Sequence, residues 1–86
     1  MSTVRKLNES ALRGIYDAYM HEAFPPAELK PLAVMLRLME RGRYLCYGYY
    51  RNGRLAAYAF FYRHDSRVLL LDYFAVTPEL RGRGVG

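Results

Sequence analysis

The sequence predicts a single α+β domain over residues 1–86, a mostly antiparallel sheet with two helices inserted between its first and second strands. Two apolar stripes with helical spacing fill the first half of the chain. An Asn-Gly pair at residues 52–53 then separates two aromatic segments, which is the strongest short-range signal of a β-hairpin. A long apolar segment at residues 68–76 adds a fourth strand, so the predicted order is strand, helix, helix, strand, strand, strand.

The size of the chain limits what it can bury. With 86 residues it forms one domain with a marginal core, because a chain of this length buries only about 60% of the surface that its unfolded form exposes. Hydrophobic residues nevertheless make up 52% of the sequence. We therefore expect an apolar face that further chain or a partner covers, as a homo-oligomer or with a complementing C-terminal chain.

The charge pattern argues against several kinds of partner. The formal net charge is +5, but the longest run of basic residues is Arg5-Lys6, so we expect neither nucleic-acid nor membrane binding. The single Cys46 and the distant His21 and His64 leave no metal-ligand spacing. Since there is no leader and no apolar run near the roughly 18 residues of a membrane span, we expect a cytoplasmic protein.

The sequence pattern in the first half of the chain predicts a short strand at residues 3–7 and two amphipathic helices. Asn8 is a good N-cap for the first helix, which ends at Phe24-Pro25-Pro26. Its apolar stripe consists of Leu12, Ile15, Tyr16, Tyr19, Met20 and Ala23.

The second helix begins near Pro31, because proline suits a first helical turn. Gly42 is expected to end this helix by adopting the left-handed backbone conformation just after its last turn. Its apolar stripe consists of Leu32, Met35, Leu36 and Met39.

The hairpin joins predicted strands at residues 43–51 and 54–63. A two-residue type I′ turn between them fixes the register and places Tyr47 opposite Tyr58. We interpret a tyrosine pair of this kind as ordinary cross-strand packing.

The end of the chain joins a strand to a glycine-spaced loop. Residues 68–76 are almost entirely apolar, with Asp72 the only charge, which predicts a strand buried on both faces. Thr77-Pro78 ends this strand. The following Arg-Gly-Arg-Gly-Val-Gly, residues 81–86, lets successive N–H groups converge on one anion, although it matches neither a Walker A loop nor the dinucleotide fingerprint.

This loop resembles the pyrophosphate loop of the GNAT superfamily of N-acetyltransferases. Arg81, Gly84 and Gly86 fill the fixed positions of R-x-x-G-x-G, directly after a strand that ends in Ala-Val-x-Pro. The resemblance runs through the chain in order but covers only the first half of a complete family member. It implies an incomplete acyl-CoA N-acyltransferase fold and transfer of an acetyl group from acetyl-CoA to an amine.

The resemblance also implies which residues meet the cofactor. In the family a bulge in the fourth strand frees main-chain groups, so the backbone of Phe74 would face the acetyl oxygen and that of Val76 the pantetheine arm. The tyrosine that commonly protonates the leaving thiolate would lie beyond residue 86. The cofactor-binding set is Phe74, Ala75, Val76, Arg81, Gly82, Arg83, Gly84, Val85 and Gly86.

Three carboxylates are candidates for handling the amine. Asp72, expected on the same face of its strand as Phe74, would take the proton of the amine, or else it caps or bonds a neighbouring loop. Residues 24–28 would border the acceptor, with Glu22 and Glu28 attracting a cation, or these two are ordinary surface carboxylates. The acceptor itself stays open among a small amine, an antibiotic, a peptide N-terminus and a lysine.

Three functional hypotheses follow. The first is an N-acetyltransferase that is inactive as this chain alone. The second is a non-enzymatic truncated or split module that binds a partner along the exposed edge of its last strand. The third is a general anion or nucleic-acid binder that uses Arg81 and Arg83.

Overall fold

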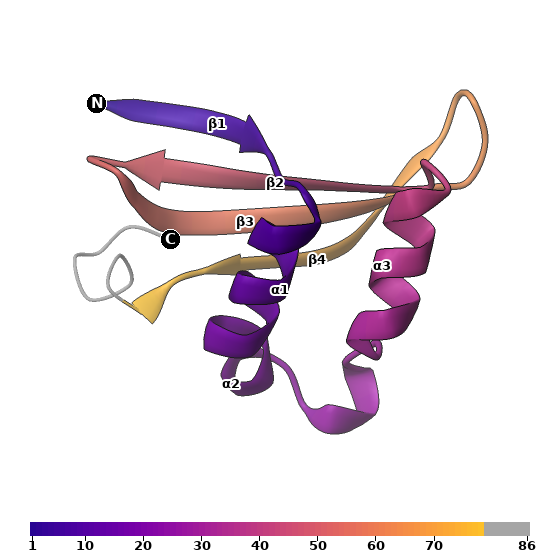
Figure 1. Cartoon of the computed structure of the whole chain (residues 1–86), viewed down its shortest axis with the longest axis horizontal. Coiled ribbons are helices and arrows are strands. Elements are labelled where there is room, and N and C mark those ends of the chain that lie inside the picture. The colour runs from indigo at the N-terminus through magenta and orange to yellow at the C-terminus, as the bar shows by residue number, and fades with distance from the viewer. Residues whose placement is uncertain (79–86) are drawn as a thin grey trace.

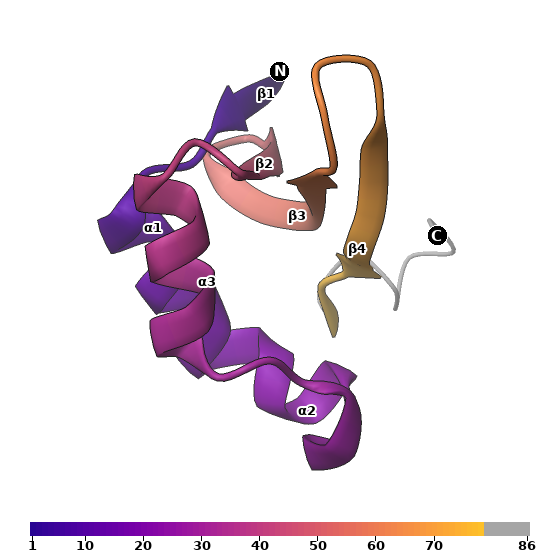
Figure 2. The same ribbon diagram turned by 90° about the vertical axis from the view of Figure 1, so that its right-hand side faces the viewer.

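The computed structural model describes residues 1–78 and confirms the predicted α+β architecture (Figure 1). The strands form one antiparallel sheet in the order β1-β2-β3-β4, and the helices lie together on one of its faces (Figure 2). The elements are β1 (Ser2–Lys6), α1 (Glu9–Ile15), α2 (His21–Ala23), α3 (Leu32–Glu40), β2 (Tyr44–Arg51), β3 (Arg54–Arg63) and β4 (Leu69–Val76). No helix in residues 1–78 is long and apolar enough to cross a membrane.

The first helical segment begins where the sequence predicts. The Asn8 side chain accepts a hydrogen bond from the N–H of Ala11 at 2.9 Å, which satisfies one donor of the first turn. A π-helical turn at Tyr16–Met20 joins α1 to α2, a feature that the periodicity did not reveal. Phe24 has an extended backbone and ends the segment, as predicted.

Helix α3 follows Pro31 and ends at a left-handed glycine. Gly42 has a φ of 73°, which lets the N–H of Arg43 reach the carbonyl of Leu38 at 2.9 Å. Met35, from the middle of the helix, is fully buried in the core.

The core lies between the helices and the sheet. Cys46 is part of it, and burial raises the pKa of its thiol to about 12, so this cysteine stays protonated at neutral pH. The cluster consists of Leu7, Leu12, Ile15, Tyr16, Met20, Met35, Tyr44, Cys46, Tyr58, Phe60 and Tyr73.

The hairpin turn is confirmed, but the predicted register is wrong beyond it. Asn52 and Gly53 both have positive φ, as a type I′ turn requires. Tyr47 pairs with Ala59 instead of Tyr58, because the register shifts by one residue along β3. The turn therefore fixes the pairing only for the first two residue pairs.

The shift has its cause in an extra residue, Ala56, which forms a β-bulge. The carbonyl of Ala56 accepts a hydrogen bond from the N–H of Thr77 at 2.9 Å. The Thr77 hydroxyl also donates to the carbonyl of Leu55 at 3.1 Å. Thr77, the residue that follows β4, therefore holds this bulge in place, although it lies 21 positions after Ala56 in the chain.

The expectation that residues 68–76 are buried on both faces is also wrong. β4 is the last strand in the sheet order, and its first three residues are exposed. Leu71 is 59% exposed and Phe74 is 57% exposed. The large apolar side chains exposed on or beside this strand are Val68, Leu69, Leu70, Leu71 and Phe74.

Candidate functional site

The main-chain groups of β4 alternate in direction, and two of them point away from the sheet. In an antiparallel pair, the N–H and C=O of one residue face the neighbouring strand, and those of the next residue face away. Since the N–H of Thr77 bonds to the carbonyl of Ala56, the groups of Ala75 also face β3. Those of Phe74 and Val76 therefore point toward the outer edge of β4.

This outer edge is open within the described part of the chain. The sheet order ends at β4, and no strand within residues 1–78 pairs with its outer side. An extended ligand with amide groups of its own could therefore bind along Phe74 and Val76 as an added strand. These are the two residues whose backbone the resemblance implies at the acetyl group and at the pantetheine arm.

A second bulge lies immediately before these residues. Leu71 pairs with Phe61 and Tyr73 pairs with Phe60, so Asp72 is an extra residue in β4. Both Asp72 and Tyr73 consequently point their side chains to the helical side. The expectation that Asp72 shares a face with Phe74 is wrong, because the inserted residue breaks the alternation.

Asp72 is bonded to two residues from other elements. Its carboxylate lies 2.9 Å from Nζ of Lys30 and accepts a hydrogen bond of 2.5 Å from the Tyr44 hydroxyl. Burial raises the pKa of the Tyr44 phenol well above its ordinary value, and the hydrogen bond to Asp72 adds to the shift, so Tyr44 is a neutral donor. Asp72 thus binds Lys30 in the neighbouring loop, and its role toward the amine stays a prediction.

The Tyr73 side chain binds main-chain atoms of the same loop. Its hydroxyl donates to the carbonyl of Glu28 at 2.7 Å and accepts from the N–H of Lys30 at 2.8 Å. The Tyr16 hydroxyl donates to the carbonyl of Lys30 at 2.8 Å, and the ring of Phe24 packs edge-on against Tyr73 at 4.9 Å between centroids. The connection between α2 and α3 is thereby fastened to β4.

Sequence reasoning did not identify Lys30, Tyr16, Tyr44 or Tyr73 as members of this site. The available signal was the Asp72-Tyr73 pair, which places two polar groups in succession within an apolar strand. Strict alternation would send one of them to each face, so both can reach the helical side only through a bulge.

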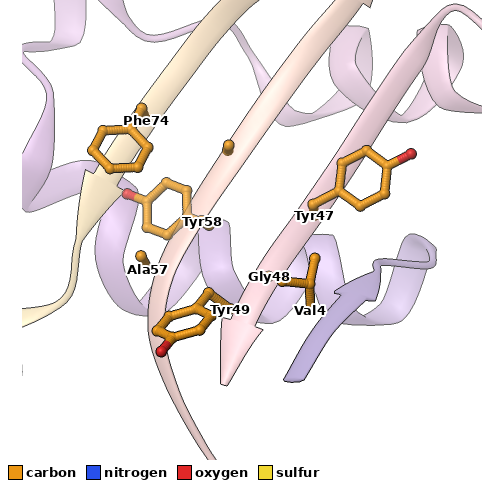
Figure 3. Close-up of a pocket in the computed structure, with 8 residues that line it drawn as sticks. Val4, Tyr47, Gly48, Tyr49, Ala57, Tyr58 and Phe74 are labelled. Carbon is orange, nitrogen blue, oxygen red and sulfur yellow. The ribbon is translucent and has the colours of Figure 1, made fainter. Parts of the chain in front are cut away.

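The opposite face of the sheet carries a shallow apolar hollow of about 170 Å³ (Figure 3). Two small residues of β3, Ala57 and Ala59, form its floor between larger side chains of the neighbouring strands. Phe74 borders it from β4, and Tyr47 and Tyr49 border it from β2. The ring of Phe74 therefore faces this hollow, whereas its main chain faces the sheet edge.

The remaining candidates are either exposed or outside the described residues. Glu22, in α2, and Glu28, in the connection between α2 and α3, are both exposed. The residues of the predicted anion loop, Arg81, Gly82, Arg83, Gly84, Val85 and Gly86, lie outside the described residues. Within residues 1–78 no group of three or more His, Cys, Asp or Glu side chains could hold a metal ion.

Comparisons with known proteins agree with this architecture. The model of a family described as Acetyltransferase (GNAT) family matches residues 10–86. The crystal structure of the ribosomal-protein-S18-alanine N-acetyltransferase from Escherichia coli is similar, with a TM-score of 0.68 and 24% sequence identity. The similarity covers 98% of this chain and 51% of that one, so the chain spans about half the length of that structure. A comparison with curated proteins gives no significant match.

Proposed function

Because the chain belongs to the acetyltransferase (GNAT) family, we propose that it takes part in moving an acetyl group from acetyl-CoA to an amine. The observation that supports this most is the open edge of β4, where the main-chain groups of Phe74 and Val76 point outward. An acyl-CoA thioester carries amide groups along its pantetheine arm, which can bond to such an edge. The two arginines and three glycines of residues 81–86 would hold the pyrophosphate.

The chemistry needs positioning and one well-placed donor. The nitrogen of a neutral amine attacks the thioester carbon, a C–N bond forms, the C–S bond breaks, and the thiolate leaves. The carbonyl oxygen gains negative charge during the attack, and the outward N–H of Phe74 would donate a hydrogen bond to it. The residue that protonates the thiolate would come from beyond residue 86.

We also propose Asp72 as the group that takes the proton of the amine, directly or through water. Asp72 lies two residues before Phe74, whose N–H would face the acetyl oxygen. It would have to give up a bond to Lys30 or Tyr44 to do so, since both residues bind its carboxylate. In that role Lys30 would compete with the acceptor amine for the same oxygen atoms.

The acceptor would meet the connection between α2 and α3. Phe24 and Glu28 lie on this connection, and β4 holds it in place through Tyr73. The similar Escherichia coli protein is described as acting on an alanine of a ribosomal protein, so a peptide with an N-terminal alanine is a suitable first acceptor to assay. The exposed carboxylates Glu22 and Glu28 would favour an acceptor with positive charge nearby.

The cofactor proposal is tested by a substitution in the glycine-spaced loop. We expect Gly84→Val to weaken coenzyme A binding about tenfold or more, because a side chain at this position keeps main-chain amides away from the anion. Arg54→Ala, at the hairpin turn, should bind coenzyme A like the parent protein. Calorimetric titration of the chain, alone and with a supplied C-terminal half of a family member, measures both, and equal affinities for the parent and Gly84→Val would refute the cofactor role.

A second candidate function, a non-enzymatic module that binds a partner along β4, is favoured by the exposed leucines of that strand. An unprotected apolar edge associates with other chains, and β4 contains one charge and no proline. We expect the 86-residue protein to sediment as a dimer or larger species at micromolar concentration and to show no acetyl transfer alone. A stable monomer that transfers acetyl groups would contradict both expectations.

A further inference from the structure

We propose that Tyr73 is a positioning residue for the acceptor, because its hydroxyl fixes the distance between the loop that borders the acceptor and the strand that would hold the acetyl group. The inference rests on the proposed acetyl transfer and concerns the same site. Tyr73 is 6% exposed, so its hydroxyl acts inside the protein and would not touch the substrate.

The two bonds of Tyr73 both go to main-chain atoms of the loop. Its hydroxyl accepts from the N–H of Lys30 at 2.8 Å and donates to the carbonyl of Glu28 at 2.7 Å. A hydroxyl has one proton and two lone pairs, so this pair of bonds uses its donor and one acceptor site. The contact therefore holds the path of the loop whatever side chains the loop carries.

The bulge at Asp72 makes this contact possible. It turns Asp72 and Tyr73 to the same side of β4, where Asp72 binds the side chain of Lys30 while Tyr73 binds its main chain. The next residue, Phe74, points its main chain to the open edge. One short stretch of β4 thus holds both the acceptor loop and the acetyl-binding edge, and a loose loop would no longer present an amine at the distance that attack requires.

Tyr73→Phe removes the hydroxyl and keeps the ring that packs against Phe24. We expect the Lys30 amide to exchange with solvent about tenfold faster than in the parent, because it loses its hydrogen-bond partner. The Leu7 amide, which donates to the carbonyl of Cys46 at 2.7 Å, reports on the stability of the core and should change little. Tyr62→Phe, a tyrosine of β3 packed against the core, is the matched control, and NMR hydrogen exchange measures all of these sites.

The kinetic readout separates positioning from stability. With an alanine-starting peptide and acetyl-CoA, in the complex with a supplied C-terminal half, Tyr73→Phe should lower kcat/KM for the peptide about tenfold, mainly through kcat, and leave the KM of acetyl-CoA within about twofold. Tyr62→Phe should leave both constants at their parent values. Unchanged exchange at Lys30, or an unchanged kcat/KM for the peptide, would overturn the positioning role.

The two proposals fail in different ways. A parent protein that binds no coenzyme A, alone or in the complex, overturns acetyl transfer and with it the acceptor role of Tyr73. In that case the hydrogen-exchange rate of the Lys30 amide still decides whether the Tyr73 hydroxyl holds the loop in place. If Tyr73→Phe binds coenzyme A normally and the exchange rate of its Lys30 amide is unchanged, only the positioning role of Tyr73 is overturned.

Discussion

Phe74→Pro is expected to lower kcat/KM for acetyl transfer about 100-fold or more, because it removes the N–H that would bond to the acetyl oxygen as charge develops there. Proline is normally excluded from a strand because its missing N–H breaks the ladder. At Phe74 this N–H points to the open edge and donates nothing to β3, so the sheet should tolerate the change. Initial rates with acetyl-CoA and an alanine-starting peptide, in the complex with a supplied C-terminal half, give the comparison.

Phe74→Ala is the matched control for this experiment. It keeps the N–H and removes only the ring, which faces the hollow on the opposite side of the sheet. We expect kcat/KM to stay within about threefold of the parent value, since removing interactions that are not made in the transition state changes little. Equal losses in the two variants would show that the side chain matters and the amide does not.

Phe60→Ala is expected to leave the chain close to unfolding. Phe60 is fully buried and packs against Tyr58 and Tyr44, with ring centroids 5.3 Å and 6.0 Å away. Removing a buried phenylalanine ring costs about 3–5 kcal/mol, whereas the free energy of unfolding of a whole domain is only about 5–15 kcal/mol. A shift of the urea midpoint to much lower concentration, or loss of the cooperative transition, is the result to look for.

The neighbouring residue provides the control. Phe61 projects to the opposite face of the sheet, is only partly buried, and contacts the ring of Tyr47 at 6.2 Å between centroids. We expect Phe61→Ala to lower the free energy of unfolding by about 1 kcal/mol. If both alanine variants lost the same stability, the assignment of the two faces of β3 would be wrong.

The sequence by itself determined the four strands and the two helical segments, their order and the ends of the helical segments. Asn8, the proline pair after Phe24 and Gly42 act within one or two turns of the chain, so their effects follow from nearby residues alone. The Asn-Gly turn likewise sets the first pairs of the hairpin without help from the rest of the fold. The resemblance to GNAT proteins also came from a contiguous motif, which the family comparison confirms over residues 10–86.

Only the tertiary structure decided which side chains lie on the same face of β3 and of β4. The bulge at Ala56 is held by Thr77, and the bulge at Asp72 sends two consecutive side chains to Lys30, 42 and 43 positions earlier in the chain. A residue inserted into a strand leaves the apolar pattern nearly unchanged but reverses the face of every residue on one side of it. Hydrogen bonds between distant segments determine where the inserted residue lies. Asp72 and Tyr73 therefore contact the connection between α2 and α3, whereas Phe74 turns to the opposite face.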